Sequence, residues 1–163
     1  MARVFTLPWK NITIAGATTL AYLRPSATVP IEIVEVRIGF STNSTSAMQR
    51  VELVRQVVSG SPASTATSPV NLDQGLTQAC SITGGSGNMA AGTGGVNVST
   101  EASGARTTLV PDTFNHTTGF IWVPGPDGPI RMAAGSSSIF GVYLPSAPSV
   151  LTGWSGCVTF LER

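Results

Sequence analysis

The side chains that could carry out chemistry are few: one histidine, two cysteines and eight acidic residues. His116 lies in the stretch Phe114-Asn-His-Thr-Thr118, between two predicted strands, and no serine lies in a Gly-x-Ser-x-Gly motif. A serine or cysteine nucleophile needs an adjacent base, and a lone histidine in a turn does not suit that purpose. We expect His116 to be a turn residue that forms local hydrogen bonds. We predict no catalytic residue, and that the chain is not an enzyme.

The acidic residues offer a second kind of chemistry, since paired carboxylates hydrolyse glycosides. Glu32, Glu35 and Glu52 lie on strands that we expect to pair, so two of them could approach each other. Arg37 and Arg50 are expected opposite them, and cross-strand ion pairs explain this arrangement better. The remaining candidates, Asp73, Asp112 and Asp127, fall in predicted loops, where aspartate commonly caps turns.

Metal and cofactor sites lack the residues that they require. A structural zinc site needs four cysteine or histidine ligands, and the chain offers Cys80, Cys157 and His116. The glycine-rich stretch 84–95 contains no lysine to complete a phosphate-binding loop, since the only lysine is Lys10. We therefore predict no metal and no cofactor. The two cysteines are expected to be free thiols, with a Cys80–Cys157 disulfide as the alternative.

Charge is unusually sparse in this sequence. Only 10% of the residues are charged, against about 25% in an average domain, while 42% are apolar and the net charge is +1. Mean hydropathy is positive at +0.24, which argues against intrinsic disorder. No basic block is present, so we expect no nucleic-acid partner. An uncharged surface suits a subunit that packs against neighbours.

Two stretches could be mistaken for membrane or export segments. Residues 139–161 form an uncharged run long enough to span a bilayer, but Pro145, Pro148 and three glycines interrupt it. Two strands joined by a loop explain the run better, and we expect no membrane partner. At the N-terminus, Pro8, Trp9 and Lys10 interrupt any signal-peptide core, so synthesis in a cytoplasm is expected.

Helix signals are nearly absent, whereas short β-branched and aromatic runs recur between Gly, Pro, Ser and Asn residues. This pattern is typical of strands. The clearest run, Ile31–Phe40, alternates with period two, and Met48–Val58 is its expected antiparallel partner. The predicted strands are Val4–Leu7, Ile12–Ile14, Thr18–Leu23, Ile31–Phe40, Met48–Val58, Thr107–Val110, Gly119–Val123, Ile130–Met132, Ile139–Leu144 and Trp154–Leu161.

The segment 59–105 differs from the rest, because Ser, Gly, Thr and Ala dominate it and it holds two charged residues, Asp73 and Glu101. We expect a long surface excursion with extended pieces near Val70–Leu72 and Val96–Ser99. A short helical turn could begin at Asp73. We also expect this segment to need a neighbouring subunit to become ordered.

The ten predicted strands and one long loop in 163 residues indicate a single all-β domain. We predict an antiparallel, jelly-roll-like β-sandwich that spans residues 1–163, with one long Gly/Ser/Thr-rich loop.

Several stretches together resemble a known family. They are Phe5-Thr-Leu-Pro-Trp-Lys-Asn-Ile-Thr-Ile14, the strand Pro30–Ile38, the Gly/Ser/Thr excursion, Asp112-Thr-Phe-Asn115, and Gly119-Phe-Ile-Trp-Val-Pro-Gly-Pro126. In outline they resemble the β-sandwich capsid decoration, or cement, proteins of tailed bacteriophages. The likeness covers most of the chain as a pattern, without a single diagnostic motif.

The resemblance implies a virion protein on the capsid exterior, often a homotrimer at threefold positions, with the major capsid protein as its partner. A phage tail, neck or head-fibre component is one alternative, and a carbohydrate-binding β-sandwich module is another. We expect apolar side chains to anchor the contacts with partners. The candidates are Trp9, Leu76, Met89, Val96 and Leu151.

Overall fold

A computed structural model describes residues 2–41, 46–58, 62–73, 75, 77–83, 91–135 and 137–163. The described residues form twelve strands and no helix. The strands are β1 (Arg3–Ile12), β2 (Thr18–Leu23), β3 (Ile31–Phe40), β4 (Met48–Val57), β5 (Ala63–Thr67), β6 (Val70–Asn71), β7 (Gly94–Thr100), β8 (Arg106–Asn115), β9 (Phe120–Trp122), β10 (Ile130–Met132), β11 (Ser138–Leu144) and β12 (Trp154–Glu162).

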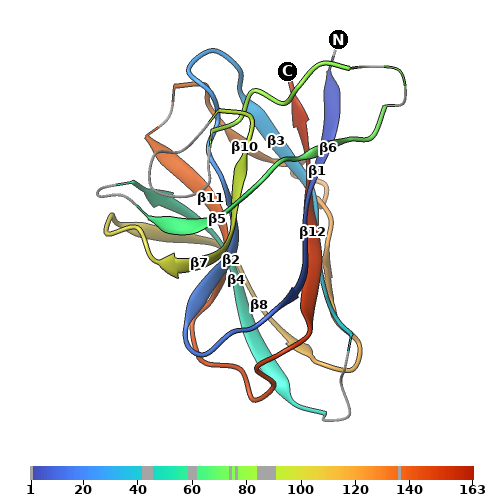
Figure 1. Cartoon of the computed structure of the whole chain (residues 1–163), viewed down its shortest axis with the longest axis vertical. Helices are drawn as coiled ribbons and strands as arrows, with labels where there is room; N and C mark the ends of the chain where they lie inside the picture. Colours follow the sequence, from blue (N-terminus) through green and yellow to red (C-terminus); the bar gives the residue numbers. More distant parts are fainter. Residues whose placement is uncertain are drawn as a thin grey trace.

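Two antiparallel sheets pack face to face, which confirms the predicted β-sandwich (Figure 1). The first sheet has the order β10-β3-β12-β1-β6, with β9 also paired to β3. The second has the order β5-β7-β2-β11-β4-β8. The chain crosses between the sheets repeatedly, because β1, β2, β3 and β4 alternate between them. Both termini lie at the same end of the sandwich, since β1 and β12 are antiparallel neighbours.

The core consists of the inward side chains of both sheets. Along β1 the side chains alternate, so Phe5, Leu7 and Trp9 point inward while Pro8 and Lys10 point to solvent. Phe5 stacks on Phe160 of β12 with ring centroids 5.8 Å apart. The second sheet contributes a matching set from β2, β4 and β11 that includes Leu20, Val51, Leu53, Phe140 and Val142. Each such side chain stabilises the fold by about 1.5–3 kcal/mol when it is fully buried.

The bulge in β1 is the principal irregularity of the first sheet. Asn11 adopts a left-handed backbone conformation, with φ of 52°, and the register with β12 shifts between Trp9 and Ile12. Asparagine tolerates this region better than most residues. The Asn11 N–H donates to Ser155 Oγ of β12, and the hydroxyl of Ser41, just after β3, donates to Asn11 Oδ1, so the bulge is held from β12 and from the end of β3.

The expected pairing of Ile31–Phe40 with Met48–Val58 is wrong. β3 lies in the first sheet between β12 and the short strands β9 and β10, and β4 lies in the second sheet between β11 and β8. Consecutive strands that pass to opposite sheets cannot form a hairpin. The predicted cross-strand ion pairs are also wrong, because Arg37 binds Glu35 and Arg50 binds Glu52 within one strand.

The long segment 59–105 is structured differently from the predicted excursion. β5 and β7 pair with each other, and β7 pairs with β2, so both belong to the chain's own second sheet. β6 adds to the first sheet beside β1. Gln74 and Leu76 of the predicted helical turn lie outside the described residues.

The uncharged run 139–161 forms β11 and β12 with a loop between them, as predicted. No helix long and apolar enough to cross a membrane occurs in the described ranges.

Gly156 lies so close to its neighbours in the first sheet that a substitution there tests the packing of the sheet. An alanine Cβ at position 156 would overlap the carbonyl oxygen of Arg37 and lie 2.5 Å from the Trp9 ring. Because both neighbours are fixed in the sheet, we expect Gly156→Ala to lower the free energy of unfolding by about 1–3 kcal/mol. Urea denaturation measures it. Gly39→Ala is the control, since a Cβ there meets no atom within 4 Å. Equal losses of unfolding free energy in the two variants would contradict the close packing around Gly156.

Candidate interaction surface

The outer face of the second sheet is partly covered by the chain itself. The connection from β7 to β8 folds across it and forms a small separate cluster with Tyr22, Val98, Ala102 and Ile139, each at most 7% exposed. Gln56 of β4 donates through Nε2 to the carbonyl oxygens of Ala102 and Gly104, at 2.6 and 3.2 Å. This face therefore carries its own second core.

Glu101 fastens that connection to the sheet. Its carboxylate accepts hydrogen bonds from the Thr19 backbone N–H at 2.6 Å and from the Thr19 hydroxyl at 2.7 Å. It also pairs with Arg106 at 3.0 Å, and the Arg106 guanidinium lies 3.6 Å from the centroid of the Tyr143 ring. These contacts come from the same chain, so this end of the long segment needs no neighbouring subunit to hold it.

The outer face of the first sheet is arranged differently, because no comparable apolar cluster forms over it in the part of the chain that the structure describes. Strand register places its side chains in rows: Arg131, Glu32, Leu161 and Val4 form one row across β10, β3, β12 and β1. Side chains alternate along each strand, so every second row faces outward and the rows between them point into the core. We call this surface the open face. It comprises Val4, Thr6, Pro8, Glu32, Glu35, Arg37, Val70, Leu72, Ile121, Val123, Arg131, Cys157, Thr159 and Leu161.

The open face exposes apolar side chains at both of its margins. Ile121 and Val123 are 67% and 57% exposed at the β9 margin, and Val70 and Leu72 are both 52% exposed beside β1. Between the margins the face carries the Glu35–Arg37 ion pair at 2.6 Å. Apolar side chains together with arginine are typical of protein–protein contact surfaces. This composition supports binding.

The structure places the five predicted interface residues in three kinds of position. Trp9 and Val96 are each 5% exposed and belong to the core, Trp9 because it falls on the inward positions of β1. Leu151 is 48% exposed in the loop between β11 and β12. Leu76 and Met89 lie outside the described residues. The open face was not among the predicted sites.

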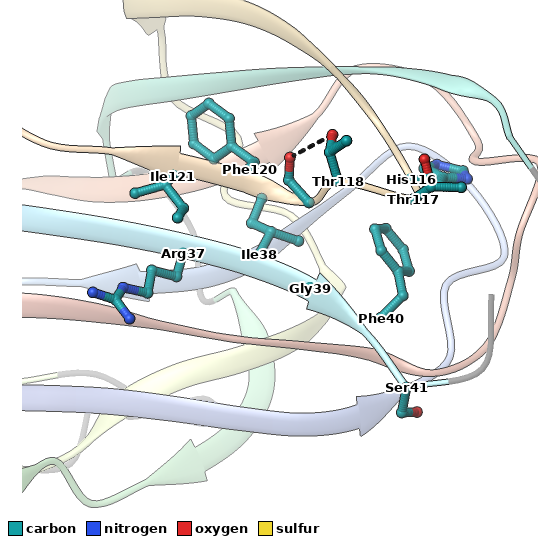
Figure 2. Close-up of a pocket in the computed structure, with 11 residues that line it drawn as sticks. Arg37, Ile38, Gly39, Phe40, Ser41, His116, Thr117, Thr118, Phe120 and Ile121 are labelled. Atoms are coloured by element: carbon teal, nitrogen blue, oxygen red, sulfur yellow. Dashed lines mark hydrogen bonds between the residues drawn. The ribbon is translucent and has the colours of Figure 1, made fainter.

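A cavity of about 570 Å³ lies between the end of β3 and the turn 116–119 (Figure 2). Ser41, Thr117 and Thr118 line it with hydroxyl groups, beside Phe40. His116 also contributes to the lining, and Figure 2 shows it at the end of the turn.

The His116 side chain differs from the sequence prediction. It is 2% exposed and packs against Phe40 and Trp154, with ring centroids 4.8 and 5.6 Å away. Neither ring nitrogen has a hydrogen-bond partner among the described residues, so the expected local hydrogen bonds are absent there. The imidazole is part of an aromatic cluster, and its nitrogens bond to no nucleophile among the described residues.

The cysteines are free thiols, as predicted. Cys80 is buried and its Sγ lies 3.0 Å from the Glu162 carboxylate, to which it donates. Burial and this hydrogen bond raise the pKa of the Cys80 thiol far above its usual range, which keeps it protonated. Glu162 also accepts from Ser81 and pairs with Arg3 at 2.7 Å. Cys80 therefore serves as a structural donor at this end of the sandwich.

The described residues contain no group of three or more His, Cys, Asp or Glu side chains placed to hold a metal ion. No protein-family model, curated protein or solved structure matches this chain.

Burial lowers the pKa of His116 below its usual value of 6.5, so the folded state resists a proton that the unfolded state accepts. The stabilising effect is complete above pH 6.5 and is lost as the pH falls toward the folded-state pKa. We expect an NMR titration of the imidazole, the only one in the chain, to give a pKa below 6.5.

His116→Phe should then weaken the fall in unfolding free energy between pH 6.5 and pH 5, because the remaining carboxylates titrate alike in both proteins. Urea denaturation across that range measures the difference. An imidazole pKa at or above 6.5 would contradict the burial of His116.

Proposed function

We propose that this chain is a structural protein of a tailed-bacteriophage head, which decorates the outside of the assembled capsid and stabilises it. The observation that carries the proposal is the open face of the first sheet. It exposes apolar side chains while the second sheet is partly covered by its own chain. Large exposed apolar areas on soluble proteins commonly mark interaction sites. The sequence resemblance to decoration proteins supports the choice of partner.

The chemistry of the surface suits contact with a large, fixed partner. The charges on the open face are paired, Glu35 with Arg37 and Glu32 with Arg131 and Arg163, so covering the surface buries no unpaired carboxylate. The major capsid protein is the proposed partner, and the shell presents many identical copies of it. A protein that binds only the assembled shell stabilises that state by mass action. A homotrimer would multiply weak contacts into avidity.

The two alternatives differ in what supports them. A tail, neck or head-fibre component would use the same open face, so its location in the virion distinguishes it from a decoration protein. A carbohydrate-binding module would need an exposed aromatic platform. The large hydrophobic side chains exposed among the described residues are Met48, Val57, Val70, Leu72, Ile121, Val123 and Leu151, with no aromatic ring. We therefore favour the structural protein.

Co-sedimentation with capsids of the parent phage tests the proposal. We expect the protein to pellet with assembled shells and to remain in solution with unassembled shell subunits. The double variants Ile121→Ser/Val123→Ser and Val70→Ser/Leu72→Ser remove exposed apolar groups, so each should weaken binding by about tenfold or more. These positions are exposed, and the unfolding free energy should change by less than about 0.5 kcal/mol.

Met48→Ser is the matched control, since Met48 is 64% exposed on β4 of the second sheet. It should bind shells as the unchanged protein does. Equal binding by all variants would show that the open face is not the contact surface. Failure to bind shells at any stage of maturation would refute the decoration proposal.

The oligomeric state can be tested separately by light scattering on the purified protein. A homotrimer should give three times the chain mass of 16.8 kDa. A mass of one chain at all concentrations would contradict a homotrimer in solution.

A further inference from the structure

Glu32 lies at one end of the open face between two arginines. Its Oε1 is 3.1 Å from Nε of Arg131, and its Oε2 is 2.8 Å from Nε of Arg163. The Glu32 side chain is only 10% exposed, whereas those of Arg131 and Arg163 are 74% and 55% exposed. One buried carboxylate therefore holds two largely exposed guanidinium groups.

The way in which Glu32 contacts the two arginines leaves other N–H groups of each guanidinium able to bind a ligand. An arginine has five N–H donors, and each of these two uses its Nε–H toward Glu32. The terminal Nη groups do not take part in the two contacts that hold the side chains in place. Together the three side chains carry a net charge of +1. Guanidinium groups that are already oriented lose less entropy when they bind a planar carboxylate.

Beside these charges is a cavity of about 390 Å³ backed by Ile31, Met132 and Ala133. Its lining is mostly apolar, and its volume is in the range of sites that hold a small ligand or one or two side chains. Leu161 and Val4 lie in the same row of the open face as Glu32, because Leu161 pairs with Glu32 in the sheet and Val4 pairs with Leu161. A partner would therefore meet positive charge and apolar surface next to each other.

We propose that this arginine pocket binds an acidic peptide segment of a partner protein, in which an Asp or Glu is adjacent to an aliphatic residue. The carboxylate would accept hydrogen bonds from the Nη groups of Arg131 and Arg163, and the aliphatic side chain would enter the cavity. A nucleic-acid backbone fits less well, because it presents no aliphatic group and the whole chain has a net charge of only +1. In assigning the segment to a partner protein, this inference rests on the proposed function and extends it.

An array of extended peptides with acidic, neutral and basic residues placed between valines and leucines tests the proposal on the full-length protein. We expect wild type to prefer the acidic peptides. Arg131→Gln/Arg163→Gln should lower affinity for a selected acidic peptide by about tenfold or more, because two charged hydrogen-bonding groups are lost. Fluorescence anisotropy of the labelled peptide measures the change.

Arg131→Lys/Arg163→Lys keeps the charge but loses the forked geometry. Its affinity for the acidic peptide should therefore lie between that of wild type and that of the double glutamine variant. Arg50→Gln is the control. Like Arg131 and Arg163, Arg50 is largely exposed, at 59%, but it pairs with Glu52 on the second sheet. The control variant should bind as wild type does, and circular dichroism should show that every variant is folded.

No preference for acidic peptides, an unchanged preference in the double glutamine variant, or preferential binding of a DNA oligonucleotide of the same charge would each overturn the proposal. The array contains no capsid, so its outcome is independent of the co-sedimentation result. Shell binding without acidic-peptide binding would remove this inference and leave the decoration proposal in place.

Discussion

The first and last strands of the chain pair along most of their length, and the first sheet depends on that pairing. β1 and β12 remain in register from Arg3 and Glu162 to Trp9 and Gly156. β12 also pairs with β3 on its other side, so it is the central strand to which β1 and β3 are both attached. Because β1 and β12 lie far apart in the sequence, all the residues between them must be present before the sheet can close. Phe5 and Phe160 stack across the same pair of strands and anchor the core there.

The outer faces of the two sheets differ in how far the chain covers them. On the second sheet, Glu101 and Arg106 tie the β7–β8 connection across the face, and the cluster around Tyr22 lies beneath it. On the first sheet, Ile121 and Leu72 remain exposed at opposite margins. The Glu101 carboxylate bonds to Thr19 as well as to Arg106, so these contacts hold the connection at one place on the face. The asymmetry between the faces therefore has a physical cause in the sequence of the β7–β8 connection.

Most of the strands could be predicted from the sequence, but few of the pairings between them could. Short apolar runs between turn residues located β2, β3 and β10 to the residue, because this signal of a strand is local. The prediction misplaced β3 beside β4, because pairing depends on which sheet each strand joins, and that is decided by contacts across the whole chain. Ala63–Thr67 was missed as a strand, since it lacks large apolar residues and is held by β7. At the surface, the alternation Phe5, Leu7, Trp9 already marked Trp9 as inward, whereas exposure of Ile121 follows from the edge position of β9, which the sequence does not encode locally.

The edges of the sandwich direct association toward its face. β8 is the longest edge strand of the second sheet and pairs with β4 alone in the sheet order. It carries Pro111, which lacks a backbone N–H, and the exposed Asp112 next to it; both features discourage another strand from adding there. In the first sheet the edges are the short strands β6, β9 and β10, which offer few backbone groups. With strand addition disfavoured at these edges, side-chain contact through the open face is the mode of association that this fold best supports.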